Sequence, residues 1–140
     1  MESKTIVSKD YNSKTCLKNI FGQQVEEYII GDGITRIGDY AFYGSIGLIS
    51  MTIPNSVSSI GEHVFQNCSF LKTIIFADGT SITTIPTYCF YKCYALESIT
   101  IPASVTSLGS YAFYGCSSLK SIDVPFGVTT VGYDAFSGCI

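Results

Sequence analysis

The fold is decided by the stretch Ser110-Tyr111-Ala112-Phe113-Tyr114-Gly115-Cys116, because the chain repeats it. Other copies begin at Asp39, Glu62, Thr87 and Tyr133. The central phenylalanine recurs every 23 residues, except that the interval from Phe65 to Phe90 is 25. A fixed period of this length is typical of a solenoid, in which each repeat packs only on its neighbours.

Each repeat has three parts. The first, Leu-x-x-Ile-x-Ile, predicts a short strand with one buried face, and it reaches the last unit at Leu119, Ile122 and Val124. The second, as at residues 105–109, predicts a short extended segment on the opposite wall. The third is the opening stretch, where a polar residue such as Ser110 precedes Phe by three. It predicts one helical turn with a polar residue near its N-cap.

Stacking of the repeats predicts a buried column formed by Phe42, Phe65, Phe90, Phe113 and Phe136. Four of the six cysteines, Cys68, Cys93, Cys116 and Cys139, occupy one repeat position. A cysteine that recurs once per repeat is interpreted as a small buried filler with a free thiol, since free cysteine is among the most buried residue types.

The 140 residues predict a single domain. Residues 1–24 are interpreted as a degenerate first unit, with a strand end at Thr5-Ile6-Val7 and Phe21 in the phenylalanine slot. The repeats then cover about residues 25–48, 49–71, 72–96, 97–119 and 120–140. The third of these is longer by two residues, which lie within residues 77–81, and Asp78-Gly79 there predicts a turn.

Composition argues against several function classes. The net charge is −3 and no run of Lys or Arg is present, which argues against nucleic-acid binding. No apolar stretch approaches the ~18 residues of a membrane span, and the N-terminus has no secretory signal. The chain is therefore either cytoplasmic or a piece of a longer exported protein.

Catalytic and cofactor chemistry find no support in the sequence. The single histidine, His63, stands where other repeats have tyrosine and is interpreted as an ordinary surface substitution. Cys89 and Cys93 are four residues apart, but no second ligand pair accompanies them. We expect no metal, no cofactor and no enzymatic activity.

The combined pattern Leu-x-x-Ile-x-Ile-Pro-x-x-Val-x-x-Ile-Gly-x-x-Ala-Phe-x-x-Cys, found over residues 25–140, resembles the BspA-type leucine-rich repeat. The resemblance implies a right-handed, β-rich α/β solenoid of about five to six repeats, with a parallel concave sheet and short helical turns. It also implies a non-catalytic module of surface proteins that binds other proteins, sometimes host matrix proteins. Ser45 in the cysteine slot and Pro86 in the glycine slot depart from the pattern.

Two candidate binding surfaces follow from the repeat. Strand residues that point away from the core form a row on the concave face, Ile29, Thr52, Ile75, Thr100 and Asp123, with a second row at Glu27, Ser50, Thr73, Ser98 and Ser121. The other surface is an aromatic edge at Tyr43, Tyr91 and Tyr114, since tyrosine is enriched at interfaces. The alternative for the edge is packing between stacked turns.

Two function hypotheses remain. The chain is either an interaction module of a cell-surface or secreted adhesin-like protein, or a structural spacer or self-assembling array without a specific ligand. Because Cys139-Ile140 stops where the next strand is due, the last unit is expected to present an open end. That end indicates either a fragment of a longer array or self-association with another copy.

Overall fold

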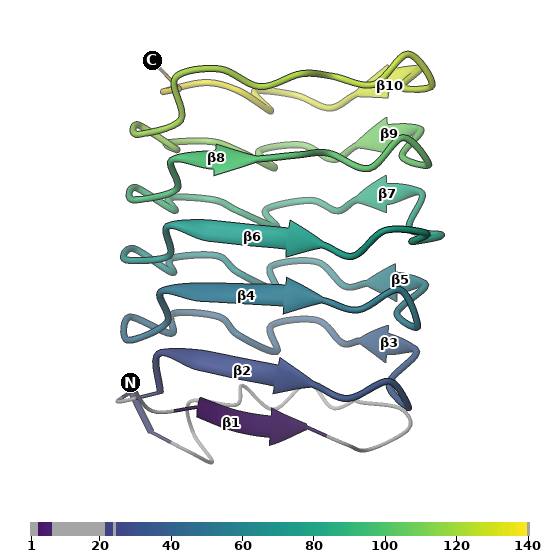
Figure 1. The fold of residues 1–140 in the computed structure, drawn as a ribbon. Coiled ribbons are helices and arrows are strands. Elements are labelled where there is room, and N and C mark those ends of the chain that lie inside the picture. Colours follow the sequence, from purple (N-terminus) through teal and green to yellow (C-terminus); the bar gives the residue numbers. More distant parts are fainter. Residues whose placement is uncertain (1–2, 7–21, 24, 140) are drawn as a thin grey trace.

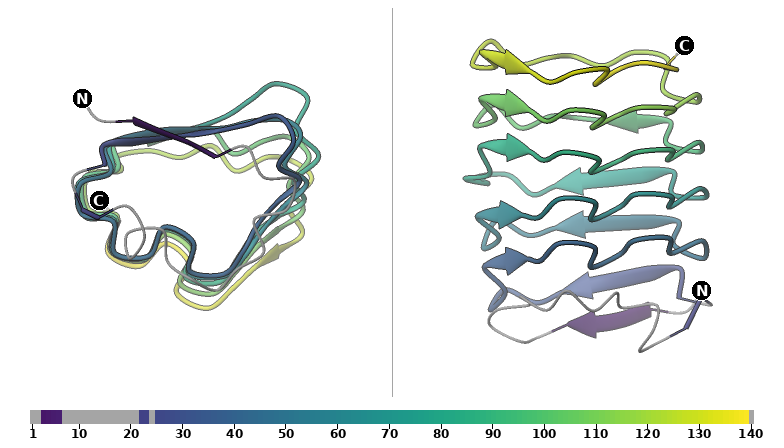
Figure 2. Two further views of the ribbon diagram at one scale, coloured as in Figure 1. Left: turned by 90° about the horizontal axis from the view of Figure 1, so that it is seen from below. Right: turned by 180° about the vertical axis from the view of Figure 1, so that it is seen from behind.

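The computed structural model describes residues 3–6, 22–23 and 25–139. The chain winds as a β-solenoid whose coils stack along one axis, from β1 at one end to β10 at the other (Figure 1). In Figure 1 the chain runs rightward along the front strands and returns leftward behind them as it rises, which is right-handed winding. Seen along the axis, most coils lie over one another (Figure 2).

The first part of each repeat forms the front strands, which are parallel. They are β1 (Ser3–Ile6), β2 (Glu27–Ile30), β4 (Ser50–Ile53), β6 (Thr73–Phe76) and β8 (Ser98–Ile99). In β4, Met51 and Ile53 point into the core while Thr52 points outward, as expected for a strand with one buried face. β1 pairs with β2, which confirms the strand predicted at Thr5 and Ile6, whereas Val7, Cys16 and Phe21 lie outside the described residues.

The second part forms the opposite wall, which confirms the short extended segments. Its strands are β3 (Arg36–Ile37), β5 (Ser59–Ile60), β7 (Thr84–Ile85), β9 (Ser107–Leu108) and β10 (Thr130–Val131). This wall divides into two sheets, β3-β5 and β7-β9-β10. The break falls at the 25-residue repeat, which carries two additional residues within 77–81 and has Pro86 in the glycine slot. Gly61, Gly109 and Gly132 donate an N–H to the preceding coil from this slot, and proline cannot.

The predicted helical turns are wrong, and with them the α part of the α/β class, because the described residues contain no helix. Tyr40, His63, Tyr88 and Tyr111, each two residues before the phenylalanine, have φ of 62°, 61°, 58° and 58°. A right-handed helix requires negative φ at every residue, so one left-handed residue ends it. The chain instead makes tight turns, and Phe42 N–H donates to Val64 O of the next coil at 3.0 Å.

The N-cap role predicted for the polar residue of the turn is also wrong. Asp39 Oδ1 accepts a hydrogen bond from Glu62 N–H at 2.8 Å, and Ser110 Oγ accepts one from Tyr133 N–H at 3.1 Å. Both acceptors join one coil to the next, because no helix N-terminus exists beside them. The polar side chain therefore stabilises the stack and not a local helix.

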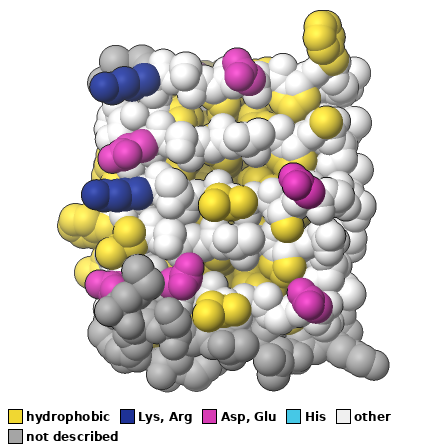
Figure 3. Space-filling model, viewed as in Figure 1, with side chains coloured by type: hydrophobic (Ala, Val, Ile, Leu, Met, Phe, Trp, Pro, Cys, Tyr) yellow, Lys and Arg dark blue, Asp and Glu magenta, His cyan; other side chains and the backbone are white. Residues whose placement is uncertain are grey.

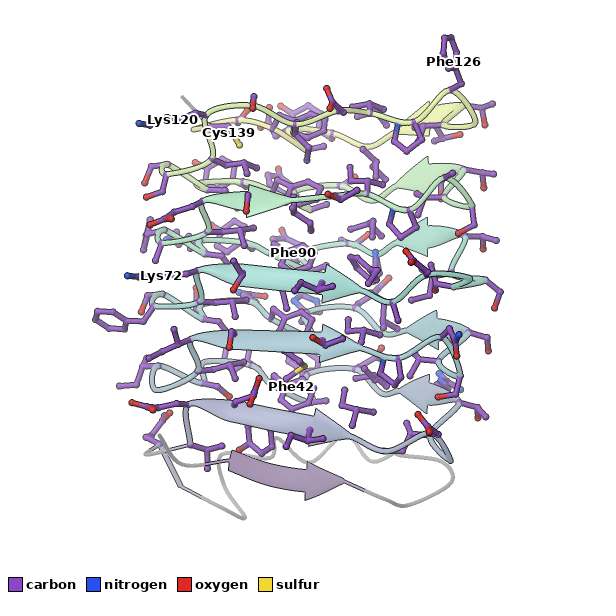
Figure 4. All side chains as sticks on the ribbon, viewed as in Figure 1. Phe42, Lys72, Phe90, Lys120, Phe126 and Cys139 are labelled. Carbon is purple, nitrogen blue, oxygen red and sulfur yellow. The ribbon has the colours of Figure 1, made fainter. Side chains whose placement is uncertain are left out.

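The phenylalanine column is confirmed. Rings in successive coils stack with centroids 5.3–5.5 Å apart and nearly parallel planes, through Phe42, Phe65, Phe90, Phe113 and Phe136. Figure 4 labels Phe42 and Phe90, which lie one above the other inside the stack. The first four rings are at most 1% exposed, and Phe136 is partly buried.

The cysteine filler is confirmed for the described residues. Cys89, Cys93 and Cys116 are buried free thiols, Cys68 is buried, and Cys139 is half-buried and free. The thiol of Cys93 donates to Phe65 O at 3.1 Å, and that of Cys116 to Phe90 O at 3.2 Å. These cysteines therefore satisfy carbonyls next to the phenylalanine column.

The glycine that ends the second part is required by close contact between coils. A Cβ on Gly109 would lie 2.4 Å from Thr87 N, and a Cβ on Gly132 would lie 2.3 Å from Ser110 N. Atoms cannot approach so closely, so a side chain here would push two coils apart.

The last repeat departs from the predicted pattern. Residues 119–124 form no strand, and Val124 is 45% exposed although the pattern places it inward. Pairing between β6 and β8 ends at Ile74↔Ile99, two residues before the end of β6. The front strands form two sheets, β1-β2 and β4-β6-β8, and in the second only β4 and β6 pair along their full length.

Candidate functional site

The outward row of the front strands lies on one face, which we call the front face. Ile29 and Ile75 are 48% and 57% exposed, and Thr52, which pairs with Ile75, is exposed between them. Thr100 follows β8 and Asp123 lies in the last repeat, and both are exposed. Figure 3 shows isolated hydrophobic side chains standing out on this face among polar ones. Of the second row, Glu27, Ser50 and Thr73 are half-buried, and Ser98 and Ser121 are exposed.

The front face is hollowed towards its C-terminal end. The hollow has a volume of about 630 Å³ and is lined by residues 76–80, 99–104 and 123–125. Figure 2 shows its origin, since the turn after β6 projects beyond the outline of the other coils, while the front of the last coil is set inward. Two residues of the predicted row, Thr100 and Asp123, line it.

Hydrogen bonds hold the projecting turn in place. Asn55 Nδ2 donates to Asp78 O at 3.1 Å, and Ala77 N–H donates to Ile53 O at 2.9 Å, so the turn is tied to the coil before it. Gly79 has a φ of 81°, which confirms the turn predicted at Asp78-Gly79. Hydrogen bonds to the preceding coil therefore fix the position of the turn that forms the wall of the hollow.

The hollow combines apolar and acidic surface. Pro102, Val124 and Pro125 contribute apolar atoms, and Asp78 and Asp123 contribute exposed carboxylates. The residues that line it include no Lys, Arg or His. Figure 3 shows hydrophobic side chains gathered on this part of the face, with acidic ones beside them. The hollow is therefore suited to a ligand that combines a positively charged group with apolar surface.

The aromatic edge consists mainly of rings that stack on one another. Tyr91 and Tyr114 lie 5.0 Å apart with an angle of 13° between planes, and Tyr43 makes an edge contact with Tyr40 at 5.6 Å. The coil between Tyr43 and Tyr91 carries Gln66 in this slot, so the three predicted residues do not form one column. The faces of Tyr91 and Tyr114 are turned towards each other, which agrees with the packing alternative for that pair.

A second aromatic column lies beside it and includes the histidine. His63 stacks on Tyr40 at 4.5 Å and on Tyr88 at 4.8 Å, and Tyr88 stacks on Tyr111 at 4.9 Å. His63 is therefore not an ordinary surface substitution, because its ring continues the column in the tyrosine slot. Desolvation by the packed rings, and then Tyr88, raises the pKa of Tyr111.

The cysteines are placed for packing and not for reaction. Burial, and then repulsion from neighbouring thiolates, raises the pKa of Cys89 and Cys93 well above the ordinary value. Burial likewise raises the pKa of Cys116 to about 12. A nucleophilic or metal-binding cysteine needs a lowered pKa. Within the described part of the chain no three His, Cys, Asp or Glu residues gather as a metal site.

Sequence reasoning missed several exposed apolar residues. Ile46, Phe70 and Tyr94 are 50%, 61% and 47% exposed on the turns between the cysteine and leucine slots. Phe126 is fully exposed and projects from the last coil (Figure 4). These residues occupy positions that vary between repeats. This variability is the sequence signal by which they could have been found. No helix among the described residues is long and apolar enough to span a membrane.

Comparisons with known proteins agree with this architecture. Residues 13–140 match the family model of the BspA type leucine-rich repeat region, in six copies. A leucine-rich repeat protein of T. pallidum is similar at 29% identity and a TM-score of 0.76, over 81% of this chain and 55% of that one. One from Eubacterium ventriosum is 31% identical with a TM-score of 0.71, over 99% of this chain and 43% of that one.

A leucine-rich cell surface protein of Faecalibacterium prausnitzii is 27% identical, with a TM-score of 0.67, over 99% of this chain and 45% of that one. The chain thus spans roughly half the length of these solved structures, or less. No curated protein matches the chain by sequence.

Proposed function

Since this chain belongs to the BspA-type leucine-rich repeat family, we propose that it is a non-catalytic module that binds another protein through its front face. The observation that carries the proposal is the exposure of Ile29 and Ile75, 48% and 57%, on hydrogen-bonded strands of the front face. Rigid strands that present isolated apolar side chains among polar ones offer a preformed surface at low entropic cost.

The proposed setting is the surface of a cell or the secreted fraction, as part of a longer protein. The support is the likeness to a leucine-rich cell surface protein of Faecalibacterium prausnitzii. Host or matrix proteins are the proposed partners, and the acidic sequence, with a net charge of −3, disfavours nucleic acid.

Binding to a panel of immobilised, purified matrix proteins tests the proposal. The triple variant Thr52→Lys/Ile75→Lys/Thr100→Lys places three positive charges on the front face and is expected to abolish binding. The matched control Ser59→Lys/Thr83→Lys/Thr130→Lys places three positive charges at exposed positions of the opposite wall and is expected to bind normally. Full binding by the front-face variant would refute this site.

A second candidate function is self-assembly through the last coil, in place of a specific ligand. Its support is the exposed apolar set on that coil, Val124, Phe126, Val131 and Tyr133. Exposed apolar surface of this kind commonly marks contact with another protein surface. The occupant proposed here is a second copy of the chain.

A further inference from the structure

The hollow on the front face lies where two repeats of the described chain depart from the common pattern. Residues 77–81 are longer by two residues than the corresponding turns, and they form the projecting wall. The floor lies at residues 99–104, and the ladder between β6 and β8 ends at the first of them, Ile99. Features that break a repeat are not needed for stacking, so their geometry is free to serve recognition.

The lining of this hollow selects the charge of a ligand. Asp78 lies on the wall and Asp123 on the far side, and both carboxylates are exposed, with no cation among the lining residues. An anionic ligand would be repelled from both sides. A cationic group between them gains attraction from two carboxylates.

The remaining lining selects the shape and polarity of a ligand. Pro102, Val124 and Pro125 offer apolar contact, and Thr100 offers an exposed hydroxyl. The volume of about 630 Å³ lies within the range of sites that hold small ligands or a few residues of a peptide. The hollow is only partly enclosed, so a bound chain can extend beyond it.

From this arrangement we infer that the hollow binds an extended segment of a partner protein that carries a lysine or arginine next to apolar side chains. The basic side chain lies between Asp78 and Asp123, and its apolar neighbours contact Val124 and the two prolines. This inference rests on the proposed function, since it specifies what part of a partner the front face would take.

The hydrogen bonds of the turn favour recognition without rearrangement. Asn55 anchors the backbone of Asp78, and Thr80 Oγ1 accepts from Ile82 N–H at 3.3 Å. Ser104 Oγ donates to Ile82 O, so the floor is tied to the same segment. A preformed site loses less entropy on binding than a mobile one.

An array of random-sequence octapeptides, probed with the labelled chain, tests the inference. We expect the bound sequences to be enriched in Lys or Arg beside Val, Ile, Leu or aromatic residues, and the binding to weaken as salt rises. For the selected peptides, Asp78→Asn/Asp123→Asn is expected to lower affinity about tenfold. The control Asp32→Asn/Glu62→Gln removes the same charge at exposed positions outside the hollow and should leave affinity unchanged.

Three results would overturn the inference: an array without bound peptides, selected peptides without enrichment of basic residues, or unchanged affinity of Asp78→Asn/Asp123→Asn. Because both carboxylates are exposed, this variant should keep the melting temperature of the parent chain, so lost binding would not reflect unfolding. If the front-face triple variant fails to bind matrix proteins while Asp78→Asn/Asp123→Asn still binds them, the proposed function stands and the inference falls.

Discussion

The single side chain that matters most is the phenylalanine of the turn. Phe113 is fully buried between Phe90 and Phe136, at ring distances of 5.3 and 5.5 Å, whereas its neighbour Tyr114 is half-buried and stacks at the edge. One position along the chain therefore separates a core residue from an edge residue.

We predict that Phe113→Ala lowers the unfolding free energy by about 3–5 kcal/mol, because it leaves a cavity in the column. Tyr114→Ala should cost only about 1 kcal/mol, since it removes a stacking contact with Tyr91 and an edge contact with Tyr111 from a half-buried position. Urea unfolding of both variants, followed by circular dichroism, measures the difference. Equal midpoints would contradict the buried column.

Buried thiols predict how stability depends on alkaline pH. Burial, and then the Cys139 thiol, raises the pKa of Cys116 from 9.0 to about 12. Above the ordinary pKa the unfolded chain has lost this proton while the folded chain keeps it, so the unfolding free energy falls as pH rises. The loss is about 1.4 kcal/mol per pH unit between the two pKa values.

Urea unfolding at several pH values between about 8 and 11 checks this prediction. Cys116→Ala is expected to be less stable at every pH, but its decline with pH should be shallower by the contribution of one thiol. Cys89 and Cys93 remain in the variant and keep a slope of the same sign, because burial raises the pKa of each. An unchanged slope in Cys116→Ala would rule out the assignment to this thiol.

At the scale of the element, the sequence predicted the front strands as far as β8, but neither the absence of a strand at residues 119–124 nor the conformation of the turn. Strands follow from alternation at residues such as Met51 and Ile53, which fill one repeated slot. The prediction of a helical turn fails because Tyr40, Tyr88 and Tyr111 adopt positive φ. This conformation is rare for aromatic residues, and nothing in the sequence at these positions indicates it. Hydrogen bonds between coils, such as that from Glu62 N–H to Asp39 Oδ1, stabilise this backbone, and the sequence of a single repeat does not reveal them.

The hollow could not be predicted from the sequence, for a different reason. The long turn at residues 77–81 was visible, and so were Thr100 and Asp123 as members of the outward row. Their convergence depends on how far the turn projects and how far residues 123–125 recede (Figure 2). Both displacements are backbone shifts that spacing does not encode.

Deletion of Gly79 and Thr80 is predicted to restore the regular repeat. Ser58 N–H donates to Thr35 O, and Thr106 N–H to Thr83 O, but among the described residues the equivalent bond from Thr83 to Ser58 is missing. The shortened turn should bring β5 and β7 together and allow the Thr83 N–H to donate to Ser58 O. The unfolding free energy is expected to change by no more than about 1 kcal/mol, because surface loops tolerate changes in length.

Hydrogen exchange at the Thr83 amide measures this effect, and protection should rise in the deletion variant. The same variant loses the wall of the hollow, so it should also lose the peptides selected on the array. Continued fast exchange at Thr83 would mean that something other than loop length separates β5 from β7.

The whole molecule behaves as a stack in which each coil is stabilised by the coils on either side. Phe65 and Phe90 have a ring above and below, whereas the outward residues of the last coil, Phe126 and Val131, remain exposed. Stability in such arrays is a sum of terms within coils and between neighbours. Phe65 and Phe90 therefore each contribute to two contacts between coils, one on either side.

Self-association through that coil makes a prediction for the molecule as a whole. If two copies meet there, the mass measured by light scattering should rise with protein concentration, and Phe126→Ser should suppress the rise. Phe70→Ser is the matched control, because Phe70 is 61% exposed at the side of the stack, away from the last coil. A parent chain that stays monomeric at every concentration would exclude this mode of assembly. Equal suppression by both variants would indicate non-specific hydrophobic association and not a defined contact.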